Sequence, residues 1–290
     1  MDKYFSATTS TTDDMIKAEV IRDVIWGLAD DMLEFKEAVV LKEMTPLEYH
    51  FTLKEGTKID PQQIAEGARA DFRKITWFDV RGSLEKWQTP ILMTDEAKAR
   101  QLNNLQLSMS ITDAAEGLAF QKDADIAAAL TAAAGNTNAA TDGWNVAATA
   151  DPAQDIAVAI GDIIGSTTLP ASAIAQIKLF YPATLLGHVA KPIQVGEIQE
   201  SIRKWTNREN LVSLYPTRQL TTDALCVVQS ERNAIHMAHD GSTIPGYEEW
   251  REPGVGTGYL ITQYFDTIVL PDARGGTTNN YICEITDVVV

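Results

Sequence analysis

Two histidines and an aspartate stand close together in the sequence, at His236, His239 and Asp240. Two imidazoles and a carboxylate form a common ligand set for a divalent metal. The residues before His239 have the pattern of a β-strand, in which side chains three positions apart point to opposite faces. We therefore expect no metal site here and assign the two histidines a role at a surface or in a loop.

Three glycines at alternate positions, Gly254, Gly256 and Gly258, form the segment GVGTG, which superficially resembles a phosphate-binding loop. Such a loop leads from a strand into a helix, whose N-terminal amides bind the phosphate. Here Gly258 leads into YLITQYFDTIVL, which has the composition of a strand. The segment therefore predicts a bend or bulge at the start of a long strand and no nucleotide site.

Other residues with catalytic chemistry are not arranged in a known motif. The sequence contains no GxSxG, HExxH or Walker pattern. Cys226 and Cys283 lie in apolar surroundings, so we expect small buried hydrophobic residues and not a disulfide framework. We predict no catalytic residue, no cofactor and no bound metal, although folding could still bring two carboxylates together.

Length and charge narrow the class of protein further. The chain has 290 residues, of which 45% are hydrophobic, so it can bury a substantial core. Its formal net charge of -16, from 40 acidic and 24 basic side chains, excludes tight binding to a polyanion through a dense basic face. No run of apolar residues is long enough for a membrane helix, and no signal-peptide pattern opens the sequence, so we expect a cytoplasmic product.

The N-terminal part predicts an arm and one amphipathic helix. A Ser/Thr-rich segment precedes Thr12, Asp13 and Asp14, which are candidate N-caps for a helix that runs to about Phe35. Apolar residues at helical spacing form a stripe that faces a neighbour, in the same chain or in another one. The stripe consists of Ile21, Val24, Ile25, Leu28 and Met32, and Ile21, Val24 and Leu28 are candidate residues of an assembly interface.

A long β excursion is predicted next. Tyr49, Phe51 and Leu53 alternate with polar residues, and a second alternating segment, Phe72 to Val80, carries aromatic side chains. The polar segment between them, Glu55 to Ala70, is expected to be the far end of a hairpin. The excursion needs a surface to lie on, and aromatic residues are enriched in interface cores. The candidate interface residues of this region are Trp77, Phe78 and Trp87.

Helical patterns dominate from residue 94 to residue 165. Two helical stretches, with a break near Gln121 to Asp123, together make a spine of about 40 residues. Gly135 to Ala150 is predicted to be a loop or short hairpin around Trp144. Asp151 and Pro152 then predict the N-cap and first position of a helix that ends at Gly165.

The remaining sequence alternates between strands and short helical segments. The predicted strands of a compact α/β unit, residues 151–247, are Ile177 to Tyr181, Leu211 to Tyr215, Leu225 to Gln229 and Ala234 to Met237. Two strand-like runs follow, Gly258 to Leu270 and Tyr281 to Val290, separated by a turn.

In this order the parts resemble the Hong Kong 97 phage fold, which major capsid proteins of tailed viruses share with encapsulin shells. The resemblance covers nearly the whole chain, and it rests on the layout and on the segments DALCVVQSERNAIHMAHD and GYEEWREPGVGTGYLITQYFDTIVLPDA. It implies an α+β fold with five parts. These are an N-arm (1–48), an E-loop (49–93), a peripheral domain with a spine helix (94–150), an axial domain (151–247) and return strands of both domains (248–290).

The resemblance also implies a function, which is that of a structural protein and not of an enzyme. The chain is then expected to assemble with itself into pentamers and hexamers of an icosahedral shell that encloses double-stranded DNA without sequence-specific binding. Portal, scaffold or cement proteins are further partners that the resemblance implies, and the location is the virion. Two alternatives stay open: an encapsulin compartment, and an α/β enzyme whose site is built from scattered acids in residues 151–247.

Overall fold

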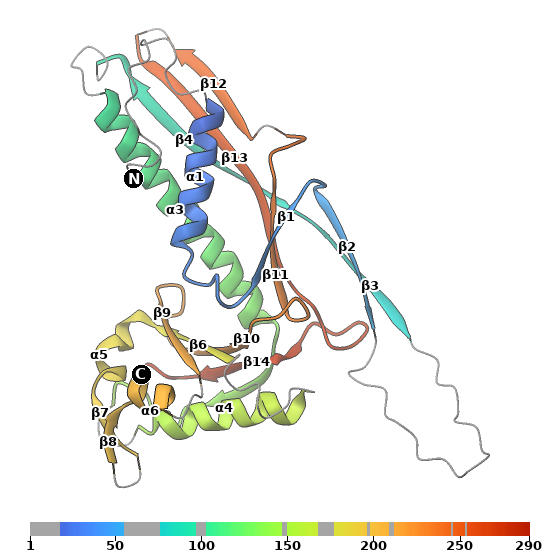
Figure 1. Ribbon diagram of the computed structural model, residues 1–290, viewed down its shortest axis with the longest axis vertical. Helices are drawn as coiled ribbons and strands as arrows, with labels where there is room; N and C mark the ends of the chain where they lie inside the picture. Colours follow the sequence, from blue (N-terminus) through green and yellow to red (C-terminus); the bar gives the residue numbers. More distant parts are fainter. Residues whose placement is uncertain are drawn as a thin grey trace.

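The computed structural model describes residues 18–54, 76–96, 103–146, 150–167, 177–195, 198–208, 212–244, 246–252 and 254–290. Figure 1 shows a long sheet with two helices on one face, a second sheet below it, and a hairpin that projects to the side. The predicted arm before Ala18, the predicted tip of the excursion from Glu55 to Ala70, and the first residues of the predicted segment Phe72 to Val80 lie outside the described residues.

The long sheet is organised around one strand, β13 (Gly256–Val269). Its 14 residues confirm the long strand predicted after the GVGTG segment. Four further strands complete the sheet, in which β13 pairs with three antiparallel neighbours and the edge strand is parallel to β11. They are β1 (Val40–Met44), β4 (Glu85–Thr94), β11 (Ala234–His239) and β12 (Tyr247–Glu252).

Two helices cover one face of this sheet, α1 (Ala18–Met32) and α3 (Asn103–Ala132). They run side by side in Figure 1, and their apolar faces share one core cluster with β4 and β13. The predicted spine helix is present, but the break expected near Gln121 to Asp123 is wrong, because α3 continues through it. Lys122 and Asp123 lie at this point of α3 and contact residues of α1 and of the turn after it. These contacts stabilise the helix where a break was expected.

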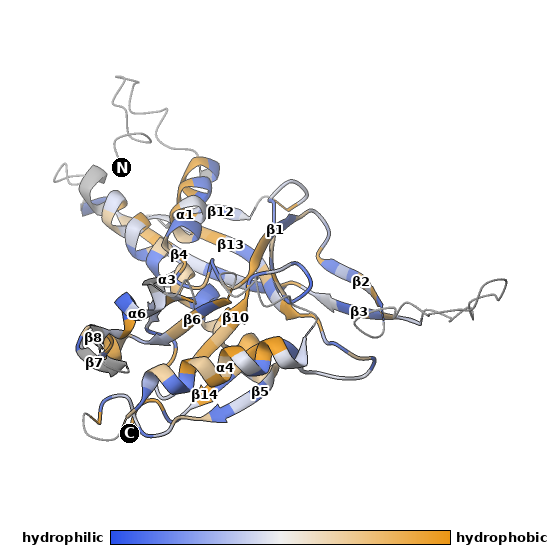
Figure 2. Cartoon of the chain, turned by 60° about the horizontal axis from the view of Figure 1, so that its bottom comes forward, coloured by the Kyte–Doolittle hydropathy of each residue, from blue (hydrophilic) through white to orange (hydrophobic). Residues whose placement is uncertain are grey.

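The second sheet has the strand order β5-β14-β10-β6-β9. Helix α4 (Pro152–Ser166) packs on one face, where the mostly apolar α4 of Figure 2 meets the apolar residues of β10 and β14. The other face contacts the last turns of α3 through a separate cluster around Phe180 and Leu130. The strands are β5 (Ala134–Ala139), β6 (Ile177–Pro182), β9 (Ser213–Thr217), β10 (Ala224–Val228) and β14 (Asn279–Thr286).

Local sequence signals position α4. Asp151 is the N-cap, since its carboxylate accepts a hydrogen bond from the Gln154 amide at 3.1 Å, and Pro152 occupies the first helical position. Asp155 then turns inward and accepts three bonds, from the Thr141 amide, the Thr141 hydroxyl and the Trp144 indole. The predicted helix is therefore confirmed, and Asp155 fixes the preceding loop against it.

Short elements connect the strands of the second sheet. A 3-10 turn and a short helix follow Pro182, and the residues from Ile198 to Arg208 form a strand and then a helix. These elements are η2 (Ala183–Leu185), α5 (Leu186–Val189), β7 (Pro192–Val195), β8 (Ile198–Ser201) and α6 (Ile202–Arg208). None of the described helices is both long and apolar enough to cross a membrane.

Strands β5, β11 and β1 are among those that differ from expectation. The loop predicted at Gly135 to Ala150 begins with β5, which gains its order by pairing in parallel with β14. The strand predicted at Ala234 to Met237 exists as β11, but it belongs to the long sheet and not to the α/β unit, since it pairs with β1 and β13. Strand β1 was not predicted, because its alternation is short and its partner lies far along the chain.

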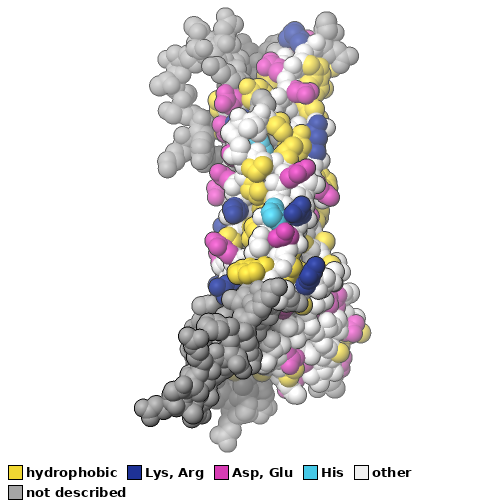
Figure 3. Space-filling view, turned by 90° about the vertical axis from the view of Figure 1, so that its right-hand side faces the viewer, with side chains coloured by type: hydrophobic (Ala, Val, Ile, Leu, Met, Phe, Trp, Pro, Cys, Tyr) yellow, Lys and Arg dark blue, Asp and Glu magenta, His cyan; other side chains and the backbone are white. Residues whose placement is uncertain are grey.

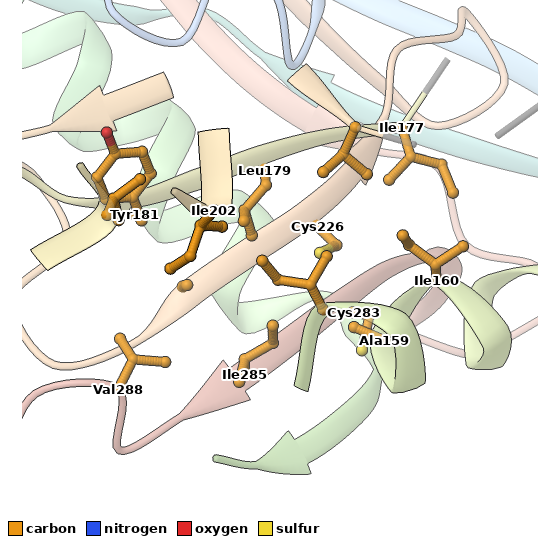
Figure 4. Close-up of a cluster of buried hydrophobic side chains, with 14 of the residues drawn as sticks. Ala159, Ile160, Ile177, Leu179, Tyr181, Ile202, Cys226, Cys283, Ile285 and Val288 are labelled. Atoms are coloured by element: carbon orange, nitrogen blue, oxygen red, sulfur yellow. The ribbon is translucent and has the colours of Figure 1, made fainter. Parts of the chain in front are cut away.

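The two cysteines are free and buried, as expected from their apolar surroundings. They are direct cross-strand partners in β10 and β14, and Figure 4 shows them in the same cluster as Ala159 and Ile160 of α4. Burial raises the pKa of Cys226 well above its ordinary value and that of Cys283 to about 12. Both thiols are therefore protonated and inaccessible at neutral pH.

We predict that neither thiol reacts with a disulfide reagent such as DTNB in the folded protein. In denaturant both should react fully within minutes, because a thiolate forms readily once Cys226 and Cys283 are exposed. Absorbance at 412 nm measures the released thiolate of the reagent. Rapid reaction of either cysteine without denaturant would contradict the burial of the pair.

Replacing Asp155 by asparagine should lower the free energy of unfolding by about 2 kcal/mol. The amide can still accept from Thr141, but its NH₂ group then meets the indole N–H of Trp144, which is left as a buried donor without an acceptor. Urea unfolding measures the loss. Asp151→Asn is the matched control, because asparagine caps a helix as well as aspartate does, and an equal loss in both variants would contradict this role for Asp155.

Candidate assembly surface

The projecting hairpin consists of β2 (Glu48–Lys54) and β3 (Trp77–Ser83), paired in register from Glu48 with Ser83 to Lys54 with Trp77. The predicted hairpin is thereby confirmed for its described part. Its apolar face comprises Tyr49, Phe51 and Leu53, which pack with Ile235, Met237, Ile268 and Leu270 of the long sheet. The alternation seen in the sequence thus decides which face of the hairpin meets the body.

One polar contact fixes the root of the hairpin. The hydroxyl of Tyr49 donates a hydrogen bond to Oδ2 of Asp266 in β13, at 2.6 Å. Gly82 stands opposite Tyr49 and leaves room for the ring, since a Cβ there would lie 2.1 Å from the phenolic oxygen. Burial, with the Asp266 carboxylate beside it, raises the pKa of Tyr49, so the phenol remains a donor.

The opposite face of the hairpin is polar and exposed. Asp79 accepts from the Thr52 hydroxyl at 3.0 Å and lies 3.2 Å from Nε2 of His50 and 3.6 Å from the Arg81 guanidinium. These contacts lower the pKa of Asp79, and the hydrogen bond from Thr52 is the largest cause. This face is well solvated, so its charges contribute little to stability.

A groove with a volume of about 760 Å³ lies where the hairpin leaves the body. Its lining combines apolar side chains, among them Leu41 of β1, Phe51 of β2 and Trp77 of β3, with the charged side chains of Lys42, Lys54, Glu231, Arg232 and Asp272. Trp77 is 56% exposed and Leu41 is 45% exposed, both high for large apolar side chains. Figure 3 views the molecule from the side of the hairpin and shows hydrophobic patches among charges of both signs.

The predicted interface residues of α1 divide into two groups. Ile21 is 1% exposed and packs in the core between α1, α3 and the long sheet, which argues against a direct contact with a neighbouring subunit. Val24 and Leu28 are half-buried at the margin of the same cluster. A contact of these two residues with another subunit stays a prediction.

The predicted aromatic residues of the excursion also differ from one another. Phe78 is 8% exposed and stands opposite Leu53 on the inner face of the hairpin. Trp87 is half-buried and stacks on Phe265, with ring centroids 5.6 Å apart. Trp77 alone among the three projects into solvent. The structure adds Leu41, which the sequence analysis missed because nothing in VLKEM marks one apolar residue of an edge strand as exposed.

A buried polar network lies behind the root of the hairpin. His236 of β11 is 2% exposed, and its Nδ1 lies 2.8 Å from the hydroxyl of Thr267, which donates to Oδ2 of Asp125 at 2.5 Å. Because the Thr267 proton goes to Asp125, its oxygen accepts from His236, and Nδ1 carries the imidazole proton. Nε2 is then a buried acceptor with no hydrogen-bond partner in the described structure.

A second part of the network joins α3 to the end of α1. Lys122 is fully buried, and its ammonium group binds Oδ1 of Asp30 at 2.5 Å. Asp123 accepts from the backbone amides of Glu34 and Phe35, each at 3.0 Å. Burial is the main cause that raises the pKa of Asp123, and likewise of Asp125, to about 6. The network therefore holds charged groups where the two sheets and the hairpin meet.

The geometry provides no chemistry at the motifs singled out in the sequence. His236 and His239 contact different partners, Thr267 and Thr243, and the described residues contain no group of three or more potential ligands placed to hold a metal. Gly256 and Gly258 have a packing role, since a Cβ at Gly256 would lie 2.2 Å from the Met93 carbonyl oxygen and one at Gly258 would lie 2.2 Å from the Trp250 ring. Asp155, the buried acid of the α/β unit, is occupied by Thr141 and Trp144.

No protein-family model and no curated protein matches the sequence. Solved structures do match. A virus-like particle from Pyrococcus furiosus has a TM-score of 0.62 at 9% identity, with 91% of this chain and 97% of that chain covered. The capsid of Myoviridae phage XM1 has a TM-score of 0.59 at 14% identity, with 87% of this chain and 90% of that chain covered. The holo-SrpI encapsulin complex from Synechococcus elongatus PCC 7942 has a TM-score of 0.52 at 11% identity, with 98% of this chain and 93% of that chain covered.

These three structures come from a virus-like particle, a phage capsid and an encapsulin complex, and the likeness extends over most of both chains in each comparison. The chain has the Hong Kong 97 capsid fold, of mixed α+β class, as the order of its sequence segments predicted. At identities of 14% or less the likeness establishes the fold and leaves the contents of any shell open.

Proposed function

We propose that this chain is the subunit of an icosahedral shell, namely the major capsid protein of a tailed virus, and that it has a structural and not an enzymatic role. The observation that carries the proposal is the hairpin that projects from a Hong Kong 97 fold, with Trp77 exposed beside the groove at its root. A surface that contacts a different surface of the next copy generates rings when the rotation closes.

Closed rings of this kind would be pentamers and hexamers, and many such interfaces stabilise a shell jointly. The proposed contents are double-stranded DNA, held by enclosure and without sequence-specific binding. The net charge of -16 is consistent with enclosure, because it provides no dense basic surface for phosphates. Portal, scaffold or cement proteins would be further partners, and assembly would take place in the host cytoplasm before the shell becomes part of the virion.

An encapsulin compartment is the second candidate. It is supported by the match to the Synechococcus elongatus encapsulin complex, which covers 98% of this chain and 93% of that chain. A compartment of this kind would enclose a protein cargo in place of a genome. The fold is compatible with both contents, so the contents of isolated particles decide between the two.

The first experiment is sedimentation and negative-stain imaging of the purified full chain at neutral pH and moderate salt. Closed particles, pentamers or hexamers support the shell; a monomer or dimer that persists at high concentration with a crowding agent contradicts it. Particles isolated from the native source are then treated with nuclease. Protected double-stranded DNA supports the capsid, whereas particles that hold one protein species and no DNA support the compartment.

A further inference from the structure

Two thiols face each other across neighbouring strands of the second sheet. Cys226 of β10 and Cys283 of β14 are direct cross-strand partners, and both side chains belong to the apolar cluster that α4 covers. Figure 4 shows the two among the labelled side chains of that cluster. Both are free, and the chain has no other cysteine. The pair can therefore perform a reaction that a single buried thiol could not.

The register places the two side chains within reach of a disulfide bond. Side chains of directly opposite residues in an antiparallel pair point to the same face, with their Cβ atoms about 4.5–5.5 Å apart. A disulfide needs Cα atoms about 4.4–6.8 Å apart, which both kinds of antiparallel pair satisfy. Rotation about the Cα–Cβ bonds, with a small adjustment of β10 and β14, is then sufficient to join the sulfurs.

Cys283 lies at the more polar margin of the pair. Nδ2 of Asn138 in β5 donates a hydrogen bond to its sulfur at 3.4 Å and another to Oδ2 of Asp162 in α4 at 2.6 Å. Asn138 and Asp162 are both partly exposed, so solvent comes close to the Cys283 sulfur on this side. A peroxide molecule is small enough to enter here, whereas an aromatic reagent such as DTNB is not.

The position of the pair in the chain gives a bond between the two sulfurs a large effect. The segment between Cys226 and Cys283 contains β11, β12 and β13, three of the five strands of the long sheet. A cross-link removes conformational freedom from the unfolded chain, and it removes more when the loop that it closes is longer. One bond in the second sheet would thus stabilise both sheets.

We propose that Cys226 and Cys283 form an oxidation site, at which a peroxide converts the two thiols into a cross-strand disulfide. The Cys283 sulfur attacks one peroxide oxygen and becomes a sulfenic acid, while the O–O bond breaks and the other oxygen leaves with the thiol proton as water. The Cys226 sulfur then attacks the sulfenic sulfur, and the hydroxyl group leaves with the Cys226 proton as a second water. Two thiols are oxidised and one peroxide is reduced. The site belongs to one subunit, so this inference does not depend on the proposed shell.

The test treats the purified full chain, freed of reductant, with hydrogen peroxide and then labels the remaining thiols with iodoacetamide in denaturant. We expect intact mass spectrometry to show a product that has lost two hydrogen atoms and takes no label, and reduction before labelling should restore both labels. The thiolate is the attacking form, and burial raises the pKa of both thiols, so the rate should rise roughly tenfold for each pH unit between 7 and 9. The oxidised chain should melt about 6 °C above the reduced chain.

Two variants separate the register from the mere presence of thiols. Cys226→Ala leaves one thiol, so peroxide should not raise its Tm. Cys226→Ala with Val228→Cys keeps two thiols in the same cluster but sets them diagonally, about 7–8 Å apart, and should form no bond. Circular dichroism of the reduced variants checks that they fold.

Four results would overturn the proposal. The first is wild-type thiols that remain fully labelled after peroxide treatment, and the second is a gain of oxygen atoms in place of the bond. The third is a link between two chains, or equal bonding in the diagonal variant. The fourth is an oxidised wild-type chain that melts no higher than the reduced one.

Discussion

Replacing Trp77 and Leu41 together by glutamate will prevent the chain from forming closed particles while the subunit stays folded. Both side chains are about half exposed, at 56% and 45%, and both line the groove at the root of the hairpin. Exposed positions tolerate substitution within about 0.5 kcal/mol of subunit stability. An aromatic anchor that becomes buried in an interface contributes about 2 kcal/mol or more, and glutamate would add a desolvated charge.

The effect should be large because every subunit of a closed shell repeats the same contact. We expect the assembled fraction to fall below about a tenth of its wild-type value in sedimentation, at unchanged Tm. Trp77→Phe with Leu41→Met is the control, since it keeps both side chains apolar and should assemble normally. Particles of wild-type yield from the double glutamate variant would contradict a role of the groove in assembly.

The same experiment could not be designed from the sequence. The aromatic set Trp77, Phe78 and Trp87 suggested truncation of all three, but Phe78 and Trp87 are packed within the subunit, and their loss would destabilise the fold itself. Composition shows that an aromatic residue will be covered by something. It does not show whether the cover is the same chain or a neighbour.

Elements with local signals were predictable, and α4 is the best example. The Asp151–Pro152 pair, the isoleucine stripe and the following strand can all be read within a few residues of one another. The hairpin was predictable for the same reason, because Tyr49, Phe51 and Leu53 alternate and the returning strand contains aromatic residues.

Features that depend on distant partners were not predictable. Val40 of β1 pairs with Ile235 of β11, and nothing near Val40 in the sequence indicates that partner. β5, with the sequence AGNTNA, has little strand propensity and becomes a strand through its pairing with β14. The stripe of α1 predicted that Ile21 faces a neighbour in the same chain or in another one, and the residues that cover it come from α3 and β13, which lie far along the same chain.

The buried network around His236 also needs the structure to be seen, since its members come from α3, β11 and β13. The sequence showed two histidines near an aspartate and raised the question of a metal. In the folded chain Asp240 instead binds the Thr45 hydroxyl and Ser242, away from His236. The partners of His236 are Thr267 and, through it, Asp125.

Acid should destabilise the subunit through His236. Burial, with Lys122 nearby as the smaller cause, lowers the pKa of His236 from 6.5 to about 3. Protonation would place a second N–H on Nε2, which has no hydrogen-bond partner, and a charge beside the buried ammonium group of Lys122. The carboxylate of Asp125 lies 4.0 Å from Nδ1 and opposes this charge, but it already accepts a hydrogen bond from Thr267.

The direction of this pH effect follows from the pKa values of His236 in the unfolded and the folded state. A histidine whose pKa is depressed in the folded state contributes stability that is present above pH 6.5 and is lost as the pH falls toward 3. Between pH 7 and pH 4 the loss from this residue is about 3 kcal/mol. Asp123 and Asp125 act in the opposite direction, because their raised pKa values of about 6 favour the folded state as the pH falls below 6.

The comparison of wild type with His236→Asn isolates the histidine, since both proteins contain Asp123 and Asp125. Asparagine retains a donor near the position of Nδ1 for the Thr267 hydroxyl, and it does not titrate. We expect the free energy of urea unfolding to fall by about 3 kcal/mol more in the wild type than in the variant between pH 7 and pH 4. His50→Asn is the control, because this exposed histidine of the hairpin should leave the pH dependence of the wild type unchanged. Parallel curves for wild type and His236→Asn would show that the buried imidazole does not govern the acid stability of the junction between sheet, spine helix and hairpin.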